Sequence, residues 1–366
     1  MLQMNRGTKS VNPDLIIVAR QTRGLTQKDL AQALRVTQGR ISKMEAGLLP
    51  VPDDLLERLA RVLEYPPHFF QQDEPVMSMG IAEIFHRKRQ DVPQRVLEKI
   101  HATMDKRRRE IAALLRSAEI QYDVPRLDPD EYGGRADKIA QLVRAHWQLK
   151  PGLIRDLTRT MEDSGIVIIP MDFETTRVDA ISRWVPRLPP LIFVNEKVPK
   201  DRLRFSLAHE LGHLVMHTLA HPDAERQADE FASEFLLPSQ DIQADLRDLS
   251  LTKLAILKRH WKVSMAAILK RADDLGVITP NQARYLWAQM ARSGWKRREP
   301  LELDVAGEEP KLVCELVEAH VHDLGYSDTD FSYLVALNPN ESWEYYLRHA
   351  NPSTQINKPH QILRAL

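Results

Sequence analysis

Two histidines and a glutamate stand at the spacing of a zinc-dependent hydrolytic site. His209, Glu210 and His213 lie in an apolar stretch with a helical pattern, so both imidazoles should project from one face, one turn apart. That geometry suits two ligands of one zinc ion. Glu210, next to the first ligand, is placed to act as the general base toward the attacking water. A helix that only buried two hydrogen-bonded histidines would not need a glutamate there.

A second predicted helix supplies the carboxylates that such a site needs. Glu225 can complete a two-histidine, one-carboxylate site, and Asp229, one turn later, can accept a ring N–H from a ligand histidine. Glu234, Glu230 and His217 are alternatives for the third ligand, His217 because it continues the histidine face by one turn. We favour Glu225, since only Glu225 has an aspartate at the offset that a supporting hydrogen bond requires.

The charge of the chain is unevenly distributed. The 51 Lys and Arg residues balance 51 Asp and Glu residues, so the whole molecule has no bulk attraction to nucleic acid. Residues 1–50, however, carry an excess of five positive charges, which fits a DNA-facing module.

The single cysteine, Cys314, excludes an internal disulfide and is expected to be a small buried hydrophobe. Residues 1–12 lack the apolar core of a signal peptide, and no apolar run could span a membrane, so we expect a cytoplasmic protein without a membrane partner.

Residues 24–47 have the pattern of a helix-turn-helix. Thr26, with Asp29 three residues later, predicts a capping box at the start of one helix, and Thr37 predicts the N-cap of a second. In the second helix Ile41 and Met44 should face inward, leaving polar side chains to meet base edges and phosphates of a major groove. The predicted DNA-contacting residues are Gln27, Thr37, Gln38, Arg40 and Lys43. Such a fold also serves as a protein-interaction module, and that alternative stays open.

The remaining pattern predicts an α+β chain that is predominantly α-helical. The expected parts are a five-helix domain at 1–72, a helical linker region at 73–150, a zincin-like domain with a small sheet and the active-site helix at 151–240, a helical extension at 241–300, and a helical C-terminal region of unknown role at 301–366. The basic helix at 92–117 is expected to present a solvated face, with DNA binding or dimerisation as the alternative. We further hypothesise that a substrate strand pairs along 191–194, taken as an edge strand.

Two families resemble these segments. Residues 15–70 resemble the XRE/Cro-type helix-turn-helix family through the stretches 24–31 and 38–47, and residues 151–238 are similar to the ImmA/IrrE metallopeptidase family through 202–213 and 225–238. The resemblance implies a gluzincin-like zinc site with His209, His213 and Glu225 as ligands and Glu210 as base. It also implies a metalloendopeptidase that cleaves a helix-turn-helix repressor in stress or mobile-element control, with DNA bound by the N-terminal domain.

Other functions fit the same residues. The chain would then be a non-proteolytic transcriptional regulator with a structural or sensory zinc site, or a peptidase whose N-terminal domain only recruits proteins. Glu210 argues against a purely structural site, because such a site gains nothing from a base. A homodimer is expected only from the symmetry that such DNA readers use. The transition-state donor is left open among His217, His221, Arg183 and Tyr122.

Overall fold

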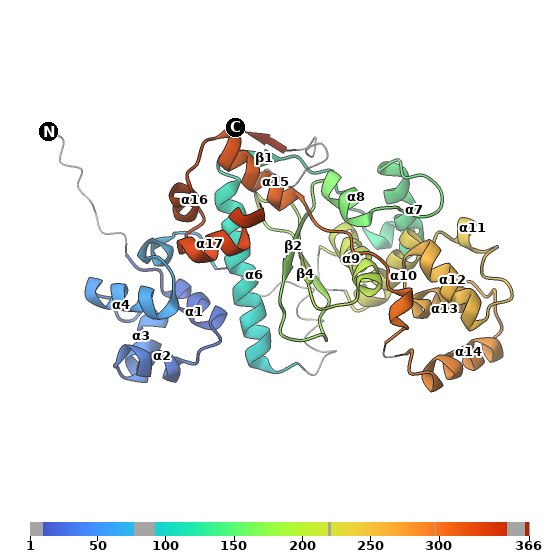
Figure 1. Ribbon diagram of the computed structural model, residues 1–366, viewed down its shortest axis with the longest axis horizontal. Helices are drawn as coiled ribbons and strands as arrows, with labels where there is room; N and C mark the ends of the chain where they lie inside the picture. The colour runs from blue at the N-terminus through green and yellow to red at the C-terminus, as the bar shows by residue number, and fades with distance from the viewer. Residues whose placement is uncertain (1–9, 77–91, 219–220, 297, 350–362, 366) are drawn as a thin grey trace.

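The computed structural model describes residues 10–76, 92–218, 221–296, 298–349 and 363–365. Helices dominate this part of the chain, and a small three-stranded sheet lies near its centre (Figure 1). The predicted α+β fold with predominant helix is therefore confirmed. No helix among the described residues is long and apolar enough to cross a membrane. Residues 77–91 of the expected linker region at 73–150 lie outside the described residues.

The N-terminal domain consists of short helices that end at the predicted breaks. They are α1 (Pro13–Thr22), α2 (Gln27–Leu34), α3 (Gln38–Glu45), α4 (Asp53–Leu63) and the 3-10 helix η1 (Pro67–Gln71). Thr26 and Asp29 form the predicted capping box of α2, and the Thr37 side chain accepts a hydrogen bond from the Arg40 N–H at the start of α3. Ile41 and Met44 are buried, as predicted.

The long helix α6 (Gln94–Leu114) packs along α1, and its basic segment is not solvated. Lys106, Arg107, Arg108 and Arg109 are only 4–6% exposed, so the prediction of a solvated face is wrong, and these side chains are not available to DNA. They pair with carboxylates of the same helix, of Glu74 and of Glu341, a residue far along the chain. Buried cations need such partners, and helical periodicity cannot reveal partners from distant segments.

The sheet has the order β2-β4-β3, with β2 (Val167–Met171) parallel to β4 (Leu191–Asn195) and β3 (Ala180–Arg183) antiparallel to it. The small sheet and the strand at 191–194 were predicted. The hypothesis that 191–194 forms an edge is wrong, because β4 is hydrogen-bonded on both sides. β3 and β4 are both short apolar runs, so the sequence does not indicate which of the two lies at the edge of the sheet. The edge strand on the side of α9 is β3.

The two faces of the sheet belong to two cores. Alternate residues such as Val167 and Phe193 join the core of the N-terminal domain, α6 and the C-terminal helices. Their neighbours, such as Ile168 and Ile192, join the core that the active-site helices build. Apolar packing therefore continues from the N-terminal helices to the sheet behind the candidate site.

Helices between residues 136 and 292 form most of the second core. They are α7 (Ala136–His146), α8 (Leu157–Asp163), α9 (Lys200–Met216), α10 (Ala224–Leu236), α11 (Ser239–Ile242), α12 (Leu251–Trp261), α13 (Met265–Asp274) and α14 (Pro280–Arg292). Trp261 is buried in this core and Trp287 packs against it. The 3-10 helix η2 (Pro129–Tyr132) precedes α7.

After α14 the chain runs back across the molecule to α6 and the N-terminal domain (Figure 1). This region contains η3 (Leu301–Leu303), α15 (Leu312–Glu318), the π-helix η4 (Ala319–Asp323), α16 (Asp328–Leu334), α17 (Pro339–Tyr345) and η5 (Leu347–His349), while β5 (Leu363–Ala365) pairs with β1 (Ala118–Ile120). Cys314 on α15 is half-buried rather than buried, and burial raises the pKa of its thiol.

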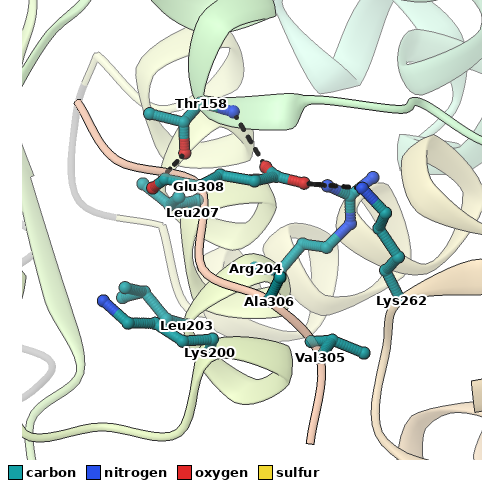
Figure 2. A pocket seen from close by; sticks show the side chains of 9 residues that line it. All are labelled: Thr158, Lys200, Leu203, Arg204, Leu207, Lys262, Val305, Ala306 and Glu308. Atoms are coloured by element: carbon teal, nitrogen blue, oxygen red, sulfur yellow. Dashed lines mark hydrogen bonds and ion pairs between the residues drawn. The ribbon is translucent and has the colours of Figure 1, made fainter. Parts of the chain in front are cut away.

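Figure 2 shows how the returning segment is fixed to the second core. The Glu308 carboxylate accepts hydrogen bonds from the backbone N–H groups of Leu157 and Thr158 at the start of α8, and it pairs with Arg204 of α9. A carboxylate at a helix N-terminus satisfies N–H groups that the helix leaves unpaired. This contact connects the C-terminal region to the helix that carries the candidate site.

Candidate metal centre

The close packing of α9 against α10 brings the predicted ligands together. Gly212 permits this approach, since a Cβ atom at this position would lie 3.2 Å from the Phe231 ring and 3.3 Å from the Cα atom of Ala228. His213 and Glu225 are buried, and His209 is half-buried. The site therefore lies between two helices whose backbones can pack closely because residue 212 has no side chain.

The three predicted ligands present their donor atoms to one point. The Nε2 atoms of His209 and His213 are 3.0 Å apart, and Glu225 oxygens lie 3.4 Å from His213 Nε2 and 3.9 Å from His209 Nε2. Ligand atoms of a tetrahedral zinc ion with bonds of about 2.0–2.1 Å are about 3.3 Å apart, so two nitrogens and one carboxylate at these distances fit that metal. Among the described residues, this is the one group of three His, Cys, Asp or Glu side chains with donor atoms close enough to share an ion.

The alternative third ligands have other partners. Glu234 pairs with Arg271 and accepts a hydrogen bond from Gln141 at 2.8 Å. Glu230 lies 3.2 Å from Arg226 on the same helix. These contacts hold both carboxylates away from the two histidines, which leaves Glu225 as the carboxylate at the histidine pair.

Asp229 lies behind His209, at the offset that the sequence indicated. Its carboxylate is 2.8 Å from His209 Nδ1, on the opposite side of the ring from Nε2. Burial lowers the pKa of His209, but the hydrogen bond with Asp229 and the nearby Glu210 carboxylate outweigh this and raise it overall. A carboxylate can only accept here, so the proton belongs on Nδ1 and the Nε2 lone pair is left for a metal.

His217 does not continue the histidine face, because α9 ends at Met216 and His217 has an extended backbone. Its ring nonetheless reaches back, with Nδ1 2.9 Å from His213 Nδ1 and Nε2 3.0 Å from Gln227 Oε1. Burial, followed by the neighbouring His213, lowers the pKa of His217 to about 4. His217 therefore contacts the far side of a predicted ligand instead of acting as a third one.

Glu210 is 2% exposed and points from α9 to the edge strand. Its Oε2 atom accepts a hydrogen bond of 2.7 Å from the backbone N–H of Ser182 on β3. Sequence reasoning missed Ser182, because a backbone N–H carries no mark in the sequence. Gln227 was missed as well, since a lone glutamine on a predicted helix gives no signal for its partner.

The suggested transition-state donors are dispersed. His217 has both ring nitrogens engaged, and His221 Nδ1 accepts a hydrogen bond from the Asp223 N–H. Arg183 is buried with a nitrogen 3.4 Å from His101 Nδ1, while Tyr122 is half exposed and packs edge-on against Trp184. None of these contacts singles out one donor.

The predicted DNA-contacting residues gather at α2 and α3. Thr37, Gln38, Arg40 and Lys43 are exposed, and Gln27 is half-buried. Gln38 donates to the Gln27 side chain at 2.9 Å, and Gln27 donates to Glu45 at 2.8 Å. Glu45 in turn is held by buried Arg20 at 2.6 Å, a pair that the sequence did not indicate. This chain of contacts orients Gln27 and Gln38 before any ligand binds.

Two segments of the chain match models of known protein families. Residues 161–273 match the family model described as the IrrE N-terminal-like domain, a peptidase family, and residues 16–70 match the helix-turn-helix family model. The chain is a fusion of a helix-turn-helix domain with an IrrE-like domain. No match to a curated protein was found.

The IrrE-like segment runs from the end of α8 to the end of α13, and so contains the whole β2-β4-β3 sheet and the candidate metal centre. The helix-turn-helix segment runs from α1 to η1. Neither segment includes α6 or the C-terminal helices; Glu341 of α17 pairs with Arg23 of the helix-turn-helix segment and with Lys106 of α6. The recognition of both families from the sequence is confirmed.

Proposed function

We propose that this protein is a zinc-dependent endopeptidase that binds DNA through its helix-turn-helix domain. The observation that carries the proposal is the convergence of His209 Nε2, His213 Nε2 and a Glu225 oxygen within 4.8 Å of one another, next to buried Glu210. Zinc bound there would lower the pKa of a water molecule toward about 7 and polarise the scissile carbonyl. The match of this segment to a peptidase family supports the same reaction.

Glu210 is the residue to which we assign proton transfer. Its carboxylate would take a proton from the attacking water as the new C–O bond forms, and would pass it to the leaving amine as the C–N bond of the peptide breaks. The Ser182 N–H holds one carboxylate oxygen, which fixes the side chain between α9 and β3. We expect the other carboxylate oxygen to face the reacting water.

The substrate segment is proposed to lie along β3 rather than β4. β3 ends the sheet on the side of α9, and the Ser182 N–H points to Glu210, away from the β4 partner strand. An extended peptide added beside β3 would pass the candidate metal centre with its carbonyl groups exposed to it. Extended segments of flexible regulatory proteins suit such strand pairing better than folded domains.

The fusion itself suggests the class of substrate. A DNA-reading domain on the same chain places the peptidase domain near proteins that occupy DNA, so we propose a helix-turn-helix repressor or a similar regulator as substrate, in a stress or mobile-element response. DNA binding rests on the exposed faces of Gln38, Arg40 and Lys43. We also propose a cytoplasmic location and a homodimer, as is usual for such readers.

The first test is metal content combined with proteolysis. Elemental analysis of the full chain should give about one zinc per wild-type chain. Glu225→Ala should lose it, while Glu210→Gln and the matched control Glu234→Gln should keep it. Cleavage of a quenched-fluorescent peptide library should then require Glu210. A metal-loaded but inactive wild type would favour a regulator with a structural or sensory zinc, and a wild type that cannot be loaded would overturn the metal site itself.

A further inference from the structure

We infer that His217 and Gln227 are positioning residues that decide which ring nitrogen of His213 carries a proton. The inference deepens the proposed zinc site and rests on it. The three side chains form one line, in which His213 Nδ1 lies 2.9 Å from His217 Nδ1, and His217 Nε2 lies 3.0 Å from Gln227 Oε1. Each contact needs one donor and one acceptor, so the protons along the line are not independent.

The donor and acceptor of each hydrogen bond in this line are set by Gln227 at its far end. With the Gln227 amide oxygen facing His217, the His217 Nε2–H donates to it, and His217 Nδ1 is left as an acceptor. His213 must then donate from Nδ1. Its Nε2, which lies 3.0 Å from His209 Nε2 at the candidate metal position, keeps its lone pair. The line thus places on His213 the one neutral tautomer that can bind a metal through Nε2.

The reversed line gives the opposite result. If the Gln227 amide were turned, its NH₂ group would donate to His217 Nε2, His217 would donate from Nδ1, and His213 would hold its proton on Nε2. That proton would occupy the metal-binding lone pair. Zinc binding therefore selects the orientation in which Gln227 accepts, and a residue that can only accept at position 227 should serve at least as well as glutamine.

The two ligand histidines are consequently supported in different ways. His209 is backed by the Asp229 carboxylate, which is half-exposed and carries a charge. His213 is backed by a neutral pair in which Gln227 is 2% exposed. A carboxylate raises the basicity of its histidine more than a neutral imidazole does. We therefore expect His213 to depend on the geometry of its supporting line more than on added charge.

Zinc affinity of the full chain tests this line. In competition with a chromophoric chelator, His217→Ala should weaken zinc binding about 10–100-fold, as loss of a ligand's hydrogen-bond partner does elsewhere. Gln227→Leu should act in the same direction, whereas Gln227→Glu, which only accepts, should retain wild-type affinity. His146→Ala removes a histidine whose ring pairs with Asp123 and should leave the affinity unchanged. Wild-type affinity in both His217→Ala and Gln227→Leu would overturn the inference.

A second readout separates this inference from the proposed function. Nitrogen-15 spectra of the histidine rings in the metal-free chain report the tautomer of His213, assigned by comparison with His213→Gln. Wild type should show the Nδ1–H form, and Gln227→Leu a mixture of both forms. A wild type that binds no zinc yet shows this difference would refute the proposed enzyme and retain the positioning line. An unchanged tautomer in Gln227→Leu would refute the line even if zinc binds.

Discussion

The carboxylate of Glu210 on α9 accepts a 2.7 Å hydrogen bond from the backbone N–H of Ser182 on β3. One contact thereby fixes the proposed base relative to both the metal-binding helix and the strand along which we place the substrate. Because the donor is a backbone N–H, the side chain of residue 182 is not part of this contact. The distance between the Glu210 carboxylate and β3 can therefore be tested by shortening the side chain of residue 210.

Glu210→Asp should keep zinc and lose most of the activity. The shorter side chain withdraws its carboxylate by about one bond length, and a displacement of about 1 Å at a reacting group can cost about 100-fold in rate. Steady-state cleavage of a peptide that the wild type cuts, together with zinc analysis, measures both. Glu230→Asp on α10 is the control, and near-wild-type kcat in Glu210→Asp would contradict the assigned role.

Gly212→Ala should destabilise the peptidase domain. The added Cβ would lie 3.2 Å from the Phe231 ring, so α9 and α10 must move apart, and such overpacking typically costs about 1–3 kcal/mol. The matched control is Gly39→Ala in α3, where a Cβ meets nothing within 4 Å and the helix should gain stability, by about 0.4–1 kcal/mol. Thermal unfolding midpoints that move in opposite directions would support this packing; equal midpoints would refute it.

Arg40→Ala and Lys43→Ala should each weaken binding to a random-sequence DNA duplex. Both side chains are exposed on α3, and loss of one phosphate contact should lower the slope of log Kd against log salt by about one. Arg284→Ala on α14, at the other end of the molecule, is the control for net charge (Figure 1). A wild-type chain without salt-dependent affinity would identify the N-terminal domain as a protein-interaction module.

Local signals predicted most of this molecule, and contacts between distant segments account for what they did not predict. The capping box at Thr26 and the helix carrying His209 and His213 could be read from spacing, because each is decided within a few residues. The position of β4 at the centre of the sheet could not, because it depends on which neighbour pairs on each side. The same reason explains the wrong expectation for Lys106, whose partner Glu341 follows 235 residues later.

The candidate site was also predicted only in part. The proposed ligands His209, His213 and Glu225 could be predicted, because their spacing along two helices is visible in the sequence. The contacts that orient these ligands run through a backbone N–H at Ser182 and through the amide of Gln227, and neither residue type indicates a metal site by itself. Hydrogen bonds that support a site can be supplied by many residue types, so only the folded arrangement identifies them.

The joint between the helix-turn-helix domain and the C-terminal helices should weaken in acid. Glu341 on α17 lies 3.1 Å from Arg23 on α1 and 2.6 Å from Lys106 on α6. Burial raises the pKa of Glu341, but the two cations outweigh it and hold the pKa below its ordinary value of 4.5. The stabilisation is thus present above pH 4.5 and is lost as the pH falls through the lowered value.

Glu341→Gln should therefore unfold more easily than wild type at neutral pH, by about 1–3 kcal/mol, because buried Lys106 and half-buried Arg23 each lose one of their carboxylate partners. As the pH falls below 4.5, the wild-type carboxyl becomes protonated and the difference between the two proteins should shrink. Urea unfolding between pH 3 and 7 measures this, with Glu344→Gln, whose side chain lies on the same helix and is exposed, as the control. A difference that stays constant over this range would show that the charge of Glu341 does not stabilise the joint.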